Sequence, residues 1–182
     1  MSLLRLILLG KAGTGKDTVA AYLAGRCGFR CYAFADKIRE IGRDLFPEHF
    51  QDGAKPRRLL QDLGIKMREL GPDCWTNYVL RRIATDDPLH AVITDCRYLR
   101  EIALAGQAGF LPVLVDCPTE IRLARLAARD GGSFRPEDLQ HVSEQETESA
   151  AVAGTVLNTG TLADLEVAVD RLLYNLYPGQ LT

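Results

Sequence analysis

The sequence lacks the features that mark disulfide-rich, zinc-binding and membrane proteins. Its five cysteines are scattered without a Cys-x-x-Cys pair, and its three histidines show no metal-ligand spacing. We interpret the cysteines as reduced thiols, which predicts a cytoplasmic protein. The apolar run at residues 3–9 contains Arg5 and is too short for a signal peptide or a membrane span, so no membrane partner is expected.

The sequence also lacks an excess of charge of either sign. It has 22 Lys and Arg against 24 Asp and Glu, giving a net charge of −2, whereas general nucleic-acid binders are normally basic. We therefore expect no nucleic-acid partner. The basic residues comprise 17 arginines and only 5 lysines, which either favours bidentate binding of phosphate or reflects compositional bias. A length of 182 residues suits a single α/β domain.

Glycine is concentrated in the stretch Gly10–Thr18, which reads GKAGTGKDT and fits the phosphate-loop pattern G-x-x-x-x-G-K. In such a loop the backbone N–H groups surround a phosphate, and Lys16 adds a positive charge beside the N-terminus of the following helix. This pattern predicts ATP binding, and a glycine turn without a ligand is the alternative. Asp17 occupies the usual Ser/Thr position, where it either binds Mg²⁺ through water or compensates the charge of the helix N-terminus.

Alternating strand and helix patterns predict a parallel sheet with helices on both faces. Strands are expected at residues 3–9, 29–34, 91–94, 110–115 and 152–157. Helices are expected at residues 16–27, 35–45, 57–70, from a cap at Asp73 through Ile83, 99–108, 119–129 and 162–176. A loop is expected at residues 48–56, and a polar excursion with a short helix after Pro136 is expected at residues 132–149.

Ligands of parallel α/β sheets bind at the carboxyl ends of the strands. This rule selects residues 10–16, 36–37, 95–97, 116–119 and 158–160. In the run ITDCR, Asp95 can hold Mg²⁺ directly or through water, and Arg97 can bind an acceptor phosphate. The alternative is a helix N-cap followed by a surface arginine.

Three arginines, Arg122, Arg125 and Arg129, share one face of the helix expected at residues 119–129. The Gly-rich break that follows favours a lid whose arginines close over phosphates, with Arg129 as the first candidate and Arg125 as the second. A solvated basic face is the alternative.

The segment between the second and third strands is expected to bind the second substrate, with Lys37, Arg57 and Gln61 as candidates. Trp75, the only tryptophan, either stacks on a base or fills the core.

These residues give the chain a resemblance to a known family. The motifs GKAGTGKDT, FADKIRE, RRLLQDLG, Asp73-Cys74-Trp75, ITDCR, HVSE and LNTG occur in this order in phage-type deoxynucleoside monophosphate kinases. The resemblance covers essentially the whole chain and implies a three-layer α/β P-loop kinase fold with a five-stranded parallel sheet. It implies one domain, with a core at residues 1–35, 88–128 and 151–182, an acceptor-binding helical region at about 36–87 and a lid at about 129–150.

The resemblance also implies that Gly13–Thr18 would hold ATP and that Lys37, Arg57, Trp75, Asp95 and Arg97 would lie around the acceptor. With the residues selected at the strand ends and in the segment after the second strand, we expect two sets of binding residues. The ATP-binding set is Lys11, Gly13, Thr14, Gly15, Lys16, Asp17, Thr18 and Asn158. The acceptor-binding set is Asp36, Lys37, Arg57, Gln61, Trp75, Asp95 and Arg97. Asp17 and Asp95 are the candidate metal ligands.

We therefore predict an enzyme that transfers the γ-phosphoryl group of magnesium-bound ATP to a (deoxy)nucleoside 5′-monophosphate. The nucleophile is already an oxyanion, so catalysis needs cations and positioning rather than a general base. The expected catalytic residues are Lys16, Asp95, Arg97, Arg129 and Arg125. The alternatives are a kinase acting on dephospho-coenzyme A or phosphomevalonate, and an ATP-binding regulatory module. The expected partners are small-molecule nucleotides, and a homodimer formed through an exposed helix is compatible with the sequence.

Overall fold

The computed structural model describes residues 3–54, 56–129 and 149–179. Strands and helices alternate through this part of the chain, as the sequence predicts. The elements are β1 (Leu4–Leu9), α1 (Lys16–Cys27), β2 (Phe29–Tyr32), α2 (Phe34–Leu45), the 3₁₀ helix η1 (Pro47–Gly53), α3 (Arg57–Leu70), α4 (Cys74–Asp86), β3 (His90–Ile93), α5 (Leu99–Gln107), β4 (Leu111–Asp116), α6 (Thr119–Arg129), β5 (Gly154–Leu157) and α8 (Leu162–Leu176).

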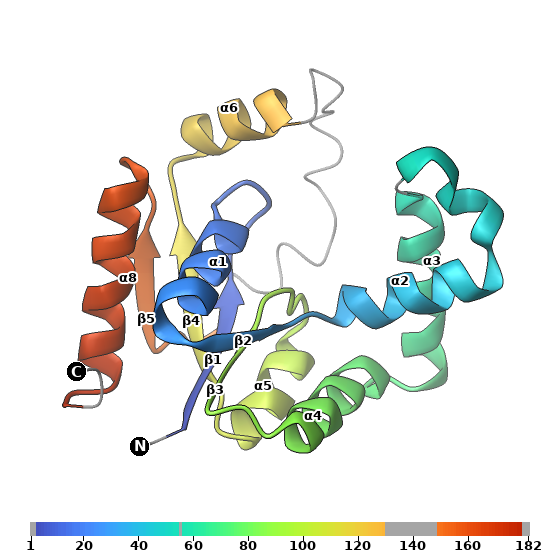
Figure 1. Ribbon diagram of the computed structural model, residues 1–182, viewed down its shortest axis with the longest axis horizontal. Coiled ribbons are helices and arrows are strands. Elements are labelled where there is room, and N and C mark those ends of the chain that lie inside the picture. Colours follow the sequence, from blue (N-terminus) through green and yellow to red (C-terminus); the bar gives the residue numbers. More distant parts are fainter. Residues whose placement is uncertain (1–2, 55, 130–148, 180–182) are drawn as a thin grey trace.

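The five strands form one parallel sheet in the order β2-β3-β1-β4-β5, which confirms the predicted fold class. β1 is central, and alternate residues along it enter different layers of the core. Leu6 and Leu8 pack with α1 and α8 on one face, whereas Ile7 and Leu9 pack with α2, α4 and α5 on the other. Figure 1 shows these two helical layers on either side of the sheet. Burial on both faces explains why β1 is an almost continuous apolar run.

The helices α2, η1 and α3 extend away from the sheet (Figure 1). They contact one another and α4, and the apolar face of α2 packs against that of α3 through Ile38, Leu60 and Leu63. The expected acceptor-binding region is therefore a compact helical excursion beside the carboxyl edge of β2. Residues 130–148, which include most of the expected lid and the helix expected after Pro136, lie outside the described residues.

The loop expected at residues 48–56 is wrong over residues 48–53, because η1 forms there. Phe50 folds back onto α2, where a Cβ atom placed on Gly42 would lie 3.1 Å from its ring. The guanidinium carbon of Arg43 lies 5.6 Å from the centre of the same ring. This packing of an aromatic side chain on a glycine compacts the segment into helical turns.

The expected side-chain cap at Asp73 is also wrong. Asp73 does precede α4, but its carboxylate makes no capping hydrogen bond to that helix. It instead accepts hydrogen bonds from Arg100 of α5, at 2.5 Å from Nε and 2.7 Å from Nη2. The guanidinium of Arg100 thus gives both carboxylate oxygens a charged donor in place of the capping hydrogen bond.

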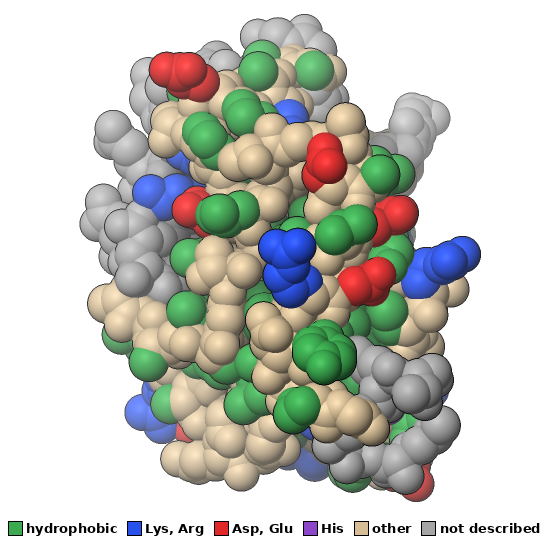
Figure 2. All heavy atoms as spheres, turned by 90° about the vertical axis from the view of Figure 1, so that its left-hand side faces the viewer, with side chains coloured by type: hydrophobic (Ala, Val, Ile, Leu, Met, Phe, Trp, Pro, Cys, Tyr) green, Lys and Arg blue, Asp and Glu red, His purple; other side chains and the backbone are tan. Residues whose placement is uncertain are grey.

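The surface formed by α8 mixes apolar and charged side chains. Figure 2 shows this side of the molecule, on which hydrophobic groups alternate with groups of both charges. Leu162, Val167 and Tyr174 are among the exposed hydrophobic residues of this helix. Within the ranges described, no helix combines the length and the apolar character needed to cross a bilayer.

His90 at the start of β3 is expected to make stability depend on pH. Its Nδ1 accepts a hydrogen bond from the Leu4 backbone N–H at 3.3 Å, and its ring lies 5.2 Å from that of Phe29. Burial lowers the pKa of His90 below its usual value. The unfolded chain therefore binds this proton more readily, so the contribution to stability is complete above about pH 6.5 and is lost as the pH falls.

We predict that His90→Gln reduces the drop in Tm between about pH 7.5 and pH 5. Thermal unfolding at several pH values measures this drop, with His49→Gln as the control because His49 is an exposed histidine outside the sheet. Equal drops in the wild type and in His90→Gln would contradict the prediction.

Candidate active site

The loop between β1 and α1 has the backbone shape of a phosphate cradle. Gly10, Gly13 and Gly15 have φ values of 135°, 84° and 99°, a region that favours glycine. A Cβ atom on Gly10 would collide with the carbonyl oxygen of Val115, and one on Gly15 would collide with Nδ2 of Asn158. The loop therefore requires glycine both for its conformation and for the close approach of its neighbours.

Lys16 begins α1 and folds back over this loop. Its Nζ donates hydrogen bonds to the carbonyl oxygens of Gly10 at 2.5 Å and Lys11 at 3.0 Å. Thr14 is buried, and its Oγ1 donates to the same Lys11 carbonyl at 3.0 Å. The ammonium group is thus held at the loop, and this arrangement fits the phosphates of ATP.

Asp17 and Thr18 occupy the first turn of α1 and are exposed. Magnesium bound with a nucleotide needs only one or two protein carboxylates, because phosphates and water complete its coordination. Among the described residues no group of three or more His, Cys, Asp or Glu side chains is suited to a metal ion. The donor set therefore fits Mg²⁺ bound together with ATP rather than an ion caged by protein alone.

Asn158, which follows β5, binds the glycine loop between β1 and α1. Its Nδ2 donates to the carbonyl oxygen of Thr14 at 2.8 Å, and its side chain is buried. Arg125 of α6 donates to Oδ1 of Asn158 at 3.2 Å and to its backbone oxygen at 3.4 Å. Asn158 and Arg125 thus lie together, as members of a network that fixes the phosphate loop.

The arginine stripe of α6 only partly matches the solvated face considered as an alternative. Arg122 is buried, donates to the carbonyl oxygen of Ala12 at 3.3 Å and packs against Gly13. Arg129 is the last residue of α6, and its side chain lies outside the described part of the chain. Two of the three arginines therefore bind the loop and its support.

Asp95 follows β3 and binds the N-terminus of α2. One carboxylate oxygen accepts from the Phe34 N–H at 2.8 Å, and the other accepts from the Ala35 N–H at 2.9 Å. Burial raises the pKa of Asp95, against the opposing effect of these two hydrogen bonds. The pairing of Ile7 with Ile93 places the ends of β1 and β3 at the same edge, so Asp95 lies at the loop's side of the sheet.

Arg97 is exposed two residues further on, and within the described residues its guanidinium has neither a hydrogen bond nor an ion pair. Its backbone N–H donates to Glu101 at 2.9 Å. Glu101 also binds Arg68 of α3 at 2.7 Å, and sequence reasoning missed both members of this pair. The one available signal was an acid in the first turn of the helix at residues 99–108, a position that suits a capping carboxylate.

The predicted acceptor residues lie along the helical excursion. Asp36 pairs with Arg39 at 2.6 Å, and Lys37 pairs with Glu40 at 2.5 Å, with its Nζ 5.5 Å from the centre of the Tyr78 ring. Arg57 and Gln61 are exposed on the first turns of α3. All four residues therefore lie on α2 or α3, within the helical excursion.

Trp75 fills the core, one of the two roles left open by the sequence. Its side chain is 4% exposed, and its Nε1 donates to the Gly64 carbonyl oxygen at 3.1 Å. The ring packs with residues of α2, α4 and α5, so it offers no open face to a base.

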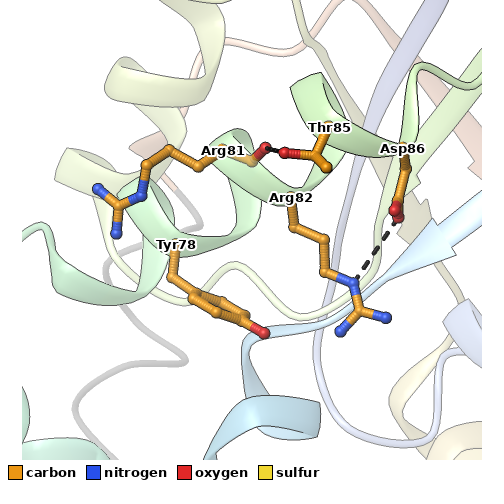
Figure 3. Close-up of a pocket in the computed structure, with 5 residues that line it drawn as sticks. All are labelled: Tyr78, Arg81, Arg82, Thr85 and Asp86. Carbon is orange, nitrogen blue, oxygen red and sulfur yellow. Dashed lines mark hydrogen bonds and ion pairs between the residues drawn. The ribbon is translucent and has the colours of Figure 1, made fainter.

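A separate pocket of about 370 Å³ lies along α4. It is lined by Tyr78, Arg81, Arg82, Thr85 and Asp86. Figure 3 shows these side chains on one side of the helix, with Arg82 directed toward Asp86. None of the residues expected at the active site lines this pocket, and α4 leads from it to the amino end of β3, away from the phosphate loop.

The network at Asn158 makes a prediction about stability. Asn158→Ala leaves the buried Thr14 carbonyl oxygen without its donor, so we expect the free energy of unfolding to fall by about 1–3 kcal/mol. Urea denaturation measures this change, with Asn77→Ala as the control because Asn77 is exposed on α4. An unfolding free energy equal to that of the wild type would show that the Asn158 amide is dispensable.

Comparisons with known proteins agree with this geometry. A family model described as an AAA domain matches residues 6–148. An adenylate kinase from Micrococcus luteus is 28% identical over 198 residues, covering 95% of this chain and 90% of its own length. A protein of Acanthamoeba polyphaga mimivirus named "Putative deoxynucleotide monophosphate kinase" is 28% identical over 141 residues, covering 61% of this chain and 72% of its own.

Solved structures share the fold. TT1252 from Thermus thermophilus superposes with a TM-score of 0.62 at 26% identity, covering 97% of this chain and 99% of its own. Shikimate kinase from Aquifex aeolicus gives a TM-score of 0.59 at 15% identity, covering 97% and 99%, which shows the fold alone. The family model covers most of the chain. The relatives and the similar structures of the chain include nucleotide and small-molecule kinases. The chain therefore belongs to the AAA domain family and has the fold of the P-loop kinases.

Proposed function

We propose that this protein transfers the γ-phosphoryl group of ATP to the phosphate of a (deoxy)nucleoside 5′-monophosphate. The observation that carries the proposal is the placement of two cations on neighbouring strand ends. Lys16 lies at the loop after β1, and Arg97 follows β3, which pairs with β1 beside the α2–α3 excursion. The relatives named adenylate kinase and deoxynucleotide monophosphate kinase support the same class of acceptor.

The donor side of the site is the glycine loop. Its backbone from Gly13 to Thr18, with Lys11 and Lys16, would surround the ATP phosphates. Asn158 acts through its hydrogen bond to Thr14, which holds the loop in shape. Asp17 and Asp95 are the residues that would hold Mg²⁺ through water, and the ion would neutralise charge on the outer phosphates of ATP.

The acceptor side is the edge of β3 and the α2–α3 excursion. Arg97 presents a guanidinium group that can bind a phosphate through two parallel hydrogen bonds. This contact matters because two polyanions must approach in line, and fixed cations lower the cost of that approach. Lys37, Arg57, Gln61 and Asp36 are the residues we propose around the remainder of the acceptor.

A coupled ADP-release assay with a panel of acceptors tests the proposed function. The panel contains the (deoxy)nucleoside monophosphates, dephospho-coenzyme A and phosphomevalonate. Transfer confined to nucleoside monophosphates supports the proposal. Transfer to one of the other acceptors, or ATP binding without transfer, would overturn it in favour of another kinase or of a regulatory module.

Lys16 and Arg97 should both be required for turnover. We predict that Lys16→Ala and Arg97→Ala each lower turnover at least about a hundredfold, equivalent to ~2.7 kcal/mol in the barrier. Lys66→Ala and Arg100→Ala are matched controls, because these residues pair with Glu69 and Asp73 instead. Near-normal turnover in both folded variants would defeat the assignment.

Asp17 should set the magnesium requirement. We predict that Asp17→Asn raises the Mg²⁺ concentration for half-maximal activity about tenfold, equivalent to ~1.4 kcal/mol, whereas Asp17→Glu raises it less. The alternative role, compensation of the helix N-terminus, is worth only ~0.3–1 kcal/mol of stability. An unchanged magnesium titration with a small loss of stability would assign Asp17 to that role.

A further inference from the structure

We propose that Glu101, held in place by Arg68, is a positioning residue that orients Arg97 toward the acceptor phosphate. The inference rests on the proposed function, because it assumes that Arg97 binds this phosphate. It adds two residues, from α3 and α5, whose side chains act on the site through the backbone.

The carboxylate of Glu101 is buried, and both of its oxygens accept hydrogen bonds. The residue is only 3% exposed, although it lies in the first turn of α5. Its Oε1 accepts from Arg68, at 3.0 Å from Nε and 2.7 Å from Nη2. Its Oε2 accepts from the backbone N–H groups of Arg97 at 2.9 Å and Tyr98 at 3.3 Å. One carboxylate oxygen therefore binds α3, and the other binds the backbone of the segment that carries Arg97.

Arg68 is itself fixed by three further features. Its side chain is 19% exposed, and its Nη1 donates to the Gly64 carbonyl oxygen at 3.0 Å. Its guanidinium carbon lies 4.8 Å from the centre of the Tyr98 ring, within the range of a cation–π contact. The same Gly64 oxygen accepts the indole N–H of Trp75, so the network ends in the core. A rigid support of this kind holds the Glu101 carboxylate at one position.

The backbone of Arg97 is held by the network, whereas its side chain is not. The backbone N–H is bound to a buried carboxylate, whereas the guanidinium is exposed and unpaired among the described residues. An arginine binds an anionic ligand more tightly when its backbone is already held in the binding orientation, because less conformational entropy is lost on binding. The pair of Glu101 and Arg68 therefore orients the exposed Arg97.

Glu101→Gln separates this role with almost no change in size. A carboxylate accepts hydrogen bonds on both sides, but an amide has one oxygen and one NH₂ group. If the amide oxygen faces Arg68, the NH₂ group opposes the two backbone N–H groups. If it faces the backbone, the NH₂ group opposes Arg68. One of the two connections is lost in either orientation.

The test is a double-mutant cycle of Glu101→Gln and Arg97→Ala, measured as kcat/KM for a nucleoside monophosphate. We expect Glu101→Gln alone to lower this value about tenfold or more and to change the KM for ATP less than about twofold. In the Arg97→Ala background, the same substitution should cost less than about twofold, because the side chain that it positions is absent. Arg68→Lys, which keeps the charge but removes the planar two-nitrogen contact, should give a smaller loss in kcat/KM that also disappears in that background.

Arg100→Gln is the matched control, because Arg100 also joins α5 to a carboxylate, Asp73, without binding the Arg97 backbone. It should leave kcat/KM near that of the wild type. Thermal unfolding of every variant identifies those that fold, and Arg68→Lys replaces Glu101→Gln in the cycle if the latter does not fold.

If the losses in kcat/KM of Glu101→Gln and Arg97→Ala multiply in the double variant, the two residues act independently and the inference is overturned. A rise in the KM for ATP as large as that in the KM for the acceptor would also overturn it, in favour of a purely structural ion pair. Absence of any effect of Glu101→Gln would also overturn it. These outcomes leave the proposed function intact, because the wild type still transfers phosphate. A wild type that transfers nothing to any monophosphate would instead reject the proposed function, and the inference with it.

Discussion

The close approach of three neighbouring segments to one glycine loop is the constraint on which the rest of the structure depends. The end of β4 meets Gly10, α6 meets Gly13 and the residue after β5 meets Gly15, each at a distance that a Cβ atom would prevent. The positions of these segments are therefore set by the loop, and the loop conformation is in turn set by them. Glycine is needed here for contact as much as for backbone freedom.

A second theme is the use of side chains on backbone groups. Asp95 and Asn158 each bind main-chain atoms of a segment distant in sequence, whereas Glu101 binds the backbone of Arg97 four residues before it. Glu101 and Asn158 are buried and Asp95 is half-buried, and each has hydrogen-bond partners, which avoids the cost of an unpaired polar group. In all three cases the segment that is held belongs to the candidate active site, so its order depends on a few polar contacts between elements.

The sequence predicted most of the secondary structure because its signals are local. α1, α3 and α8 have the expected bounds. In the structure Gly28 and Gly71 follow the ends of α1 and α3, and Thr161 caps the start of α8, so these boundaries depend on residues next to the helix ends. The parallel sheet followed from apolar strands that alternate with helices. These features need no knowledge of distant residues.

What the sequence could not predict depends on contacts over long separations. The Asp73 carboxylate does not cap α4, because it binds Arg100, which is 27 residues away. η1 accompanies the packing of Phe50 on Gly42, a side-chain contact that carries no motif. The pair of Arg68 and Glu101 spans 33 residues, and neither partner has a motif of its own. The role of Arg122 was also hidden, because a stripe of arginines does not reveal which of them faces a carbonyl oxygen.

The helical excursion of α2, η1 and α3 is joined to the sheet by few polar contacts. Asp95 holds its beginning, and Glu101 holds Arg68 near its end. The glycine loop receives its support from β4, α6 and Asn158 on other sides. An insertion, deletion or exchange of sequence within the excursion can thus change its surface without disturbing the loop, provided that both joints are kept. Under the proposed function, this separation would allow acceptor preference to change in evolution while the loop stays the same.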